Sequence, residues 1–317
     1  MSADTADGGG ARNVPGGTIL KGVGGLYTVY SEGRTLECRL RGSIRLDGRT
    51  PVTGDNVTLS FTGREGEAVI DAIAPRRNQL VRPKVANVDN MVLVIASASP
   101  APDLFLVDKL LIAARTAGIR PVLVINKADQ DAGAAARIAA EYASAATCLI
   151  TRAADKDESG LAPLLTELDG ATSVLAGQSG VGKSTILNLL TGGAFMSTGA
   201  ISEKTQRGRH TTRHAELFPV AEGLTERPSF VIDSPGFSLL ELADIGMREL
   251  ADCYPEIVDH PGVCRFQDCS HTGEPDCFVT ELVAGGAFPK ERYERYKQLY
   301  RELESREKNR YKKGKTT

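Results

Sequence analysis

Short runs of alternating hydrophobic and polar residues occupy the first part of the chain, and turn-forming pairs such as Gly24-Gly25 and Gly54-Asp55 separate them. Alternation with a period of two residues, broken at short intervals by turns, is typical of the strands of a small β-barrel. The predicted strands cover residues 17–21, 27–30, 34–40, 56–61 and 68–73. Five such strands suit an OB-type (oligonucleotide-binding) barrel over residues 17–80, although an SH3-like or other small barrel has the same pattern.

The pattern changes after residue 80, where continuous hydrophobic runs replace the alternating ones. The runs 89–95 and 121–125 flank residues 104–116, in which apolar side chains recur at helical spacing. Continuous apolar runs are typical of parallel strands that are buried on both faces. The sequence therefore predicts a βαβ unit here. Together with further strands at 146–150, 173–176 and 230–232, it predicts an α/β domain over residues 81–240.

The two ends of the chain differ from this central part. Residues 1–16 are polar and glycine-rich, which predicts a disordered tail. A charged helix is predicted over Lys290–Lys313, with Tyr293, Tyr296 and Tyr300 in its sparse apolar stripe. Tyrosines among Arg and Lys suit phosphate contacts and base stacking with RNA, whereas a helix that docks by its tyrosine stripe has the same sequence.

Charge is unevenly distributed, although the net charge of the 317 residues is only −2. Residues 15–84 carry 11 Lys/Arg and 7 Asp/Glu, a net +4, and residues 290–317 carry 11 and 5, a net +6. Because residues 1–14 carry −1, residues 85–289 have a net charge of −11. Basic ends around an acidic centre indicate ends that contact a polyanion and a centre that binds a small ligand, or simply two solvated surfaces.

Features of membrane and exported proteins are missing from the sequence. It has no apolar run of about 18 residues, and residues 1–15 contain neither the apolar segment of a signal peptide nor an Arg-rich amphipathic helix. We therefore expect a cytoplasmic protein without membrane contact. Separately, we expect it to act as a monomer.

A phosphate-binding pattern lies in the middle of the chain. The segment GQSGVGKS at 177–184 fits G-x-x-x-x-G-K-[ST], with an apolar strand before it and a predicted helix over 185–190. The glycines let backbone N–H groups face phosphate oxygens, Lys183 supplies a cation, and Ser184 supplies a hydroxyl for Mg²⁺. The predicted nucleotide-binding residues are Gly177, Gln178, Ser179, Gly180, Val181, Gly182, Lys183, Ser184 and Thr185.

A guanine-binding motif precedes this loop in the chain. Asn126, Lys127 and Asp129 belong to an N-K-x-D sequence at the end of the predicted strand 121–125, the end at which ligands bind in parallel sheets. The Asp129 carboxylate can accept hydrogen bonds from both N1–H and the exocyclic amine of guanine. Asn126 is expected to brace the loop, and the stem of Lys127 to cover the base. These residues therefore predict GTP rather than ATP.

Two further patterns are typical of the switch regions of GTPases. Asp233 and Gly236 form a D-x-x-G sequence after a predicted strand, with the carboxylate toward Mg²⁺ and the Gly236 N–H toward the γ-phosphate. Residues 192–208 are rich in Gly, Ser and Thr and are followed by His210, Thr211 and Thr212, where a threonine can bind Mg²⁺ and the γ-phosphate. In ordinary GTPases N-K-x-D comes last, so the order here predicts a circularly permuted GTPase domain.

Four candidate metal ligands follow in the C-terminal part. Cys264, Cys269, His271 and Cys277 lie within fourteen residues and are bracketed by Gly/Pro turns. Three thiolates and one imidazole suit tetrahedral Zn²⁺, and four protein ligands leave no position for a catalytic water. The sequence therefore predicts a structural zinc site in an α-helical domain over residues 241–317. Disulfide bonds are the alternative, and they are uncommon in a cytoplasmic chain.

Together, the permuted motif order, the barrel and the Cys₃His cluster resemble the RsgA (YjeQ) family of circularly permuted, ribosome small subunit-dependent GTPases. The resemblance covers almost everything after Thr18. It implies late maturation of the 30S subunit, binding to 16S rRNA, and GTP hydrolysis to GDP that the subunit stimulates and that leads to release. Thr151–Ala153 matches only in part the loop that backs guanine in such folds.

One position in the hydrolysis site departs from Ras-like enzymes, because Phe237 stands where those enzymes carry a water-orienting Gln. An apolar side chain cannot orient water. His210 is the nearest candidate, and it matches the histidine to which hydrolysis in the family is attributed, although it can also serve loop packing or rRNA contact. Two other functions fit the motifs: a nucleotide-holding RNA scaffold without turnover, and a translation or tRNA-modification GTPase.

Overall fold

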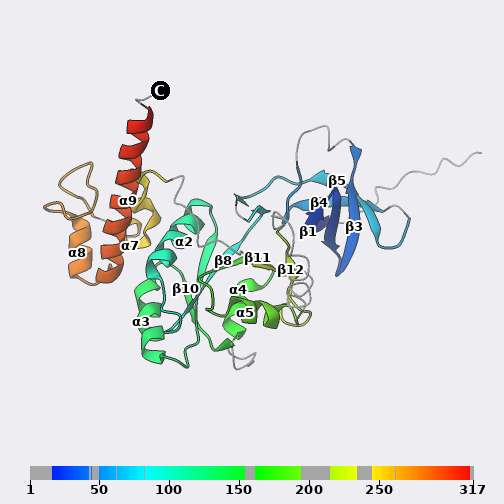
Figure 1. Ribbon diagram of the computed structural model, residues 1–317, viewed down its shortest axis with the longest axis horizontal. Helices are drawn as coiled ribbons and strands as arrows, with labels where there is room; N and C mark the ends of the chain where they lie inside the picture. The colour runs from blue at the N-terminus through cyan, green and yellow to red at the C-terminus, as the bar shows by residue number, and fades with distance from the viewer. Residues whose placement is uncertain are drawn as a thin grey trace, which may run out of the picture.

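The computed structural model describes residues 16–42, 44, 50–61, 63–81, 83–153, 161–193, 215–233, 245–260 and 262–314, with side chains to residue 309. Figure 1 shows a β-barrel at one end, a central α/β part and a helical part at the other end. No described helix is both long and apolar enough to cross a membrane.

The barrel closes in the strand order β1-β2-β3-β5-β4. Its strands are β1 (Gly16–Val23), β2 (Leu26–Ser31), β3 (Arg34–Leu40), β4 (Asn56–Phe61) and β5 (Glu67–Ile73). β3 pairs with β5 in parallel, and the other strand pairs are antiparallel. Alternate residues point inward, among them Val57 and Leu59 of β4, because successive side chains of a strand face opposite sides. The predicted OB-type barrel is confirmed.

The central sheet has the order β10-β9-β8-β11-β13-β12. Its strands are β8 (Asn90–Ala96), β9 (Arg120–Asn126), β10 (Thr147–Ile150), β11 (Thr172–Ala176), β12 (Phe218–Pro219) and β13 (Phe230–Asp233). All neighbours are parallel except the edge strand β12. β11 follows β10 in the chain but lies between β8 and β13, and every residue of β8 and β11 is buried, as their continuous apolar runs predict.

Helices cover both faces of this sheet (Figure 1). They are α2 (Leu104–Thr116), α3 (Ala132–Tyr142), α4 (Ala162–Leu168) and α5 (Lys183–Leu190). Leu110 of α2 and Ile138 of α3 pack in one core cluster, whereas Leu164 of α4 and Ile186 of α5 pack in another. The α/β fold predicted from the continuous apolar runs is therefore present.

The barrel packs directly against the sheet. Leu20 of β1 shares a core cluster with Phe230 of β13, and the rings of Tyr30 and Phe230 meet edge to face at 5.2 Å. The chain between the two parts forms a short hairpin of β6 (Gln79–Leu80) and β7 (Val85–Ala86). A shared core of this kind stabilises one orientation of the barrel relative to the sheet.

The C-terminal part consists of α7 (Pro255–Val258), α8 (Phe278–Ala284) and the long helix α9 (Lys290–Gly314), preceded by the short 3₁₀ helices η4 (Met247–Glu249) and η5 (Ala251–Cys253). Tyr293 and Tyr296 of α9 are buried against Tyr254 and Phe288. These two tyrosines therefore serve helix docking, and base stacking by them is excluded. In Figure 1, α9 runs beside α2, and Lys109 of α2 forms an ion pair with Glu302 of α9.

Candidate nucleotide site and metal centre

The phosphate loop joins β11 to α5 and needs glycine at two positions. Gly177 has φ +140°, and a Cβ atom there would lie 2.0 Å from the Val94 carbonyl oxygen. Gly182 has φ +102°, and a Cβ atom there would lie 2.3 Å from Nδ2 of Asn126. Any side chain at either position would displace the loop. Gly182 also precedes the first residue of α5 without a capping side chain, so the first N–H groups of the helix face the loop.

The amino group of Lys183 lies inside this loop. Nζ donates to the carbonyl oxygens of Gly177 (2.8 Å) and Gln178 (2.6 Å). Burial lowers the pKa of Lys183, while the nearby Asp233 carboxylate raises it. Asp233 ends β13, paired in register with Leu175 just before the loop. A partly desolvated cation and a carboxylate therefore lie together at the C-terminal edge of the sheet, where parallel-sheet proteins bind ligands.

Asn126 connects the N-K-x-D segment to the phosphate loop. Its buried side chain donates from Nδ2 to the carbonyl oxygen of Val181 at 2.9 Å. Lys127, with φ +58°, donates from Nζ to the carbonyl oxygens of Gly180 (2.7 Å) and Ser99 (2.9 Å). Asp129 is exposed at the same edge. Two motifs that are about fifty residues apart in the sequence thus form one site.

The segment after β10 supports Asn126 from the other side. Oδ1 of Asn126 accepts hydrogen bonds from the Thr151 hydroxyl (3.2 Å) and from the backbone N–H of Ala153 (3.0 Å). The carbonyl oxygen of Thr151 accepts from the N–H of Ala128. The residues 151–153 match the expected guanine-backing loop poorly, so the sequence did not predict that Thr151 and Ala153 support Asn126. The only sequence signal for this role is that the segment follows the third predicted strand.

The sequence also did not predict a contact between Gln178 and α2. Oε1 of Gln178 accepts a hydrogen bond from the backbone N–H of Asp103, the N-cap residue of α2, at 3.2 Å. No motif contains Asp103, and nothing in its sequence context indicates this contact.

Of the predicted site residues, His210, Thr211, Thr212 and Gly236 lie outside the described residues. Ser184 and Thr185 are exposed in the first turn of α5.

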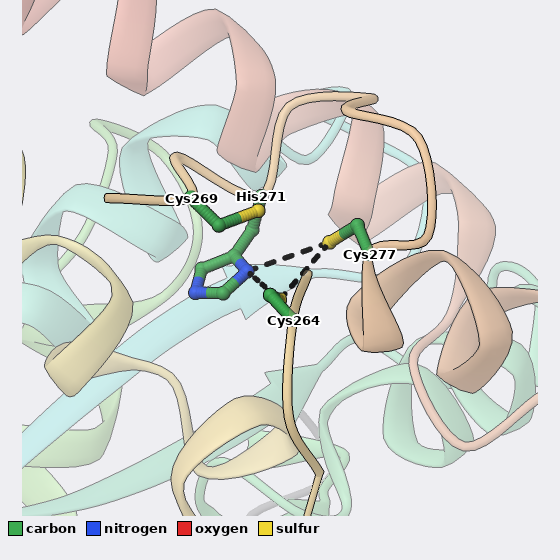
Figure 2. A group of neighbouring side chains, drawn as sticks. All are labelled: Cys264, Cys269, His271 and Cys277. Atoms are coloured by element: carbon green, nitrogen blue, oxygen red, sulfur yellow. Dashed lines mark hydrogen bonds between the residues drawn. The ribbon is translucent and has the colours of Figure 1, made fainter. Parts of the chain in front are cut away.

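The four predicted metal ligands converge in the C-terminal part (Figure 2). Their ligand atoms all lie within 4.8 Å of one another. Nδ1 of His271 is 3.5 Å from the sulfur atoms of Cys264 and Cys277, and those two sulfur atoms are 3.7 Å apart. Tetrahedral Zn²⁺ with ordinary bond lengths separates two sulfur atoms by about 3.8 Å and a sulfur from a nitrogen by about 3.6 Å. The cluster therefore has the size of a zinc site.

The chemical environment also suits a metal ion. Burial lowers the pKa of His271, although the nearby Glu274 raises it, and the net lowering favours the neutral imidazole that can act as a ligand through Nδ1. All four residues are at least partly buried. The three cysteines are free thiols in this structure, not disulfides. This favours the metal-binding interpretation over the disulfide alternative, and the residues present fit a zinc ion.

Comparisons with known proteins agree with this arrangement. The family model described as RsgA GTPase matches residues 73–243, and the RsgA N-terminal domain model matches residues 16–70. A protein of Ruminiclostridium cellulolyticum, named small ribosomal subunit biogenesis GTPase RsgA, is 43% identical over 290 residues, which is 90% of this chain and 93% of that protein. Its namesake in Geobacillus kaustophilus is 41% identical over 294 residues, 92% of this chain and 98% of that protein.

Two solved structures are similar over almost the whole chain. YjeQ from Thermotoga maritima has a TM-score of 0.75 and 31% identity, covering 91% of this chain and 98% of that one. YloQ, described as a circularly permuted GTPase, has a TM-score of 0.76 and 31% identity, covering 95% of this chain and 99% of that one. The resemblance inferred from the motifs is confirmed, and the chain belongs to the RsgA family of GTPases.

Proposed function

We propose that this protein hydrolyses GTP and acts in the biogenesis of the small ribosomal subunit, the role that the names of its relatives state for them. One observation supports the nucleotide part most directly: Asn126 of the guanine motif bonds the Val181 carbonyl of the phosphate loop. This bond supports a site in which base selection and phosphate binding lie together at the C-terminal edge of a parallel sheet.

In this proposal each part of the site has one task. Asp129 accepts from the two guanine donors, Asn126 braces the loop, and the stem of Lys127 covers the base. The N–H groups of residues 177–185 bind the phosphates, and Lys183 exchanges its bonds with the Gly177 and Gln178 carbonyl oxygens for bonds with phosphate oxygens. The left-handed glycines at 177 and 182 support this, because they keep side chains out of the cradle.

The proposed metal sites are of two kinds. Ser184 and Asp233 are the residues of this chain that would hold Mg²⁺, which, when bound, would neutralise charge on the nucleotide phosphates. Cys264, Cys269, His271 and Cys277 would hold one Zn²⁺, and its role would be structural because four protein ligands leave no position for a catalytic water. The separations of the sulfur and nitrogen atoms support the second assignment.

For hydrolysis we assign the water-positioning role to His210, with Thr211 and Thr212 at the γ-phosphate and Gly236 donating its N–H to it. This assignment rests on the sequence, since Phe237 replaces the expected Gln. The basic charge of the barrel and of α9 supports binding to 16S rRNA of the 30S subunit through phosphate contacts. Exposed arginines such as Arg39 and Arg301 are suitable donors. We further propose that the protein acts as a monomer in the cytoplasm, where subunits mature.

Hydrolysis measured with and without 30S subunits tests the proposal. We expect slow turnover by the protein alone, acceleration by the subunit, and cosedimentation with 30S in a GTP analogue but less in GDP. Tight GTP binding without turnover in either condition would favour a nucleotide-holding scaffold. Cosedimentation with whole ribosomes or with tRNA instead of 30S would favour a translation or tRNA-modification GTPase.

A further inference from the structure

We infer that Glu274 is a positioning residue of the Cys₃His centre, which holds the turn that carries His271 so that Nδ1 faces the three cysteine sulfur atoms. Glu274 is not a ligand in the cluster, and no sequence motif singled it out. The inference rests on the proposal that the four ligands bind zinc.

The Glu274 carboxylate accepts hydrogen bonds from residues on both sides of His271. Oε1 accepts from the N–H (2.8 Å) and the hydroxyl of Ser270. Oε2 accepts from the N–H of Thr272 at 2.9 Å and from the N–H of Gly273 at 3.2 Å. The hydroxyls of Ser270 and Thr272 are in turn 2.8 Å apart. One side chain thus accepts from three backbone N–H groups of the turn, those of Ser270, Thr272 and Gly273.

The turn benefits from this support because its backbone has an uncommon conformation. His271 has φ +57°, in the left-handed region, which is uncommon for residues other than Gly even though Asn, Asp and His adopt it more often than the rest. Such a conformation persists where the surroundings over-determine it, and hydrogen bonds to Ser270 and Thr272 fix both neighbours of His271. A preorganised turn presents Nδ1 to the metal without further loss of conformational entropy on binding.

A second contact fastens the same turn to the domain core. The buried hydroxyl of Tyr296 in α9 donates to the carbonyl oxygen of Ser270 at 2.7 Å. The ring of His271 also packs edge to face on Phe278 of α8 at 5.5 Å. These contacts hold the turn in place against the helices, whereas the carboxylate of Glu274 fixes its internal geometry. Residues that orient metal ligands in this way typically change metal affinity by about 10–100-fold when they are replaced.

Asp276 provides a matched control in the same loop. Its carboxylate pairs with Arg265 at 3.1 Å on the surface, with side-chain exposures of 69% and 64%. Glu274→Gln and Asp276→Asn each remove one negative charge near the site and preserve side-chain shape. Only Glu274→Gln changes the hydrogen bonds around His271. An effect of charge alone on zinc affinity should therefore appear in both variants, whereas an effect of the hydrogen bonds should appear only in Glu274→Gln.

The experiment measures zinc affinity of the full-length protein by competition with a chromophoric chelator. We expect Glu274→Ala to bind Zn²⁺ about 10–100-fold more weakly than the wild type, Glu274→Gln to be intermediate, and Asp276→Asn to stay within about twofold. The absorption spectrum of Co²⁺-substituted protein gives a second reading, in which Glu274→Gln distorts the tetrahedral bands and Asp276→Asn does not. GTP affinity shows that the remainder of each variant is folded.

Two outcomes would overturn the inference, and they differ. If the wild type and both Glu274 variants have equal zinc affinity and equal Co²⁺ spectra, Glu274 does not position His271. The same conclusion follows if Asp276→Asn loses as much zinc affinity as the Glu274 variants. Either result would leave the proposed zinc site itself intact. Wild-type protein that does not bind Zn²⁺ at all would overturn the metal centre itself and this inference with it.

Discussion

Asp108 of α2 and Arg292 of α9 form an ion pair that is almost completely shielded from water, with side-chain exposures of 0% and 2%. Arg292 also donates from Nε to Glu256 at 2.8 Å, and its guanidinium lies 4.8 Å and 4.9 Å from the ring centres of Tyr142 and Tyr254. Since Asp108 and Tyr142 belong to the α/β part and Arg292 to the C-terminal part, this pair joins two structural units.

Replacing Arg292 should therefore loosen the C-terminal part. Arg292→Met leaves the buried carboxylates of Asp108 and Glu256 without this partner, which typically costs about 3–5 kcal/mol. We expect faster hydrogen exchange across α9 and a lower midpoint in urea. Lys308→Met removes an exposed pair with Glu304 on the same helix and should cost less than about 1 kcal/mol. Equal effects of the two substitutions would contradict the importance of the buried pair.

The bond between Asn126 and Val181 predicts a loss of nucleotide affinity in Asn126→Ala. The substitution leaves a buried carbonyl oxygen and the donors of Thr151 and Ala153 without their partner. Each unsatisfied group costs about 1–3 kcal/mol, which favours other arrangements of the phosphate loop over the one that binds GTP, so GTP affinity should fall at least about tenfold. Titration with a fluorescent GTP analogue measures this. Asn56→Ala, at an exposed position of the barrel, is the control and should bind like the wild type.

Base selectivity should depend on Asp129. Asp129→Asn replaces an acceptor by an amide, which can bond the carbonyl of xanthine, so preference should shift from guanosine to xanthosine nucleotides. Competition binding with GTP, XTP and ATP measures the shift. Unchanged selectivity for GTP in this variant would show that another group recognises the base.

Removal of zinc should act locally. Because the energy of a structural zinc site is folding energy for a small unit, chelation or Cys269→Ala should expose residues 262–289 to hydrogen exchange. GTP affinity should persist, since the phosphate loop belongs to a separate core cluster. Loss of GTP binding together with zinc would show that the two sites are coupled.

His210→Ala should separate binding from turnover. Loss of a group that positions the attacking water typically lowers the rate by about 10²–10⁴-fold and leaves ground-state binding nearly intact. Single-turnover hydrolysis with saturating 30S subunits should therefore slow strongly, while GTP affinity and cosedimentation remain. Phe237→Ala is the control, with a near-normal rate expected. A wild-type rate in His210→Ala would assign the water to another group.

Several features of this protein were determined by the sequence itself, because they depend on neighbouring residues. The continuous apolar runs around 91 and 123 specified buried parallel strands, and the alternation over 56–61 specified a barrel strand. The glycines at 177 and 182 specified a loop that only glycine can form. The order of the motifs specified that the α/β fold is permuted, because that order is read along the chain and does not depend on how the chain packs.

Other features were decided by the tertiary structure alone. Asn126 and Val181 are 55 positions apart, and Asp108 and Arg292 are 184 apart, so no local pattern records either contact. Tyr293 and Tyr296 suited RNA stacking as well as docking, and only their burial against Tyr254 and Phe288 distinguished the two. The reason is physical: turn and strand preferences act between adjacent residues, whereas burial and long-range pairing depend on which surfaces the folded chain brings together.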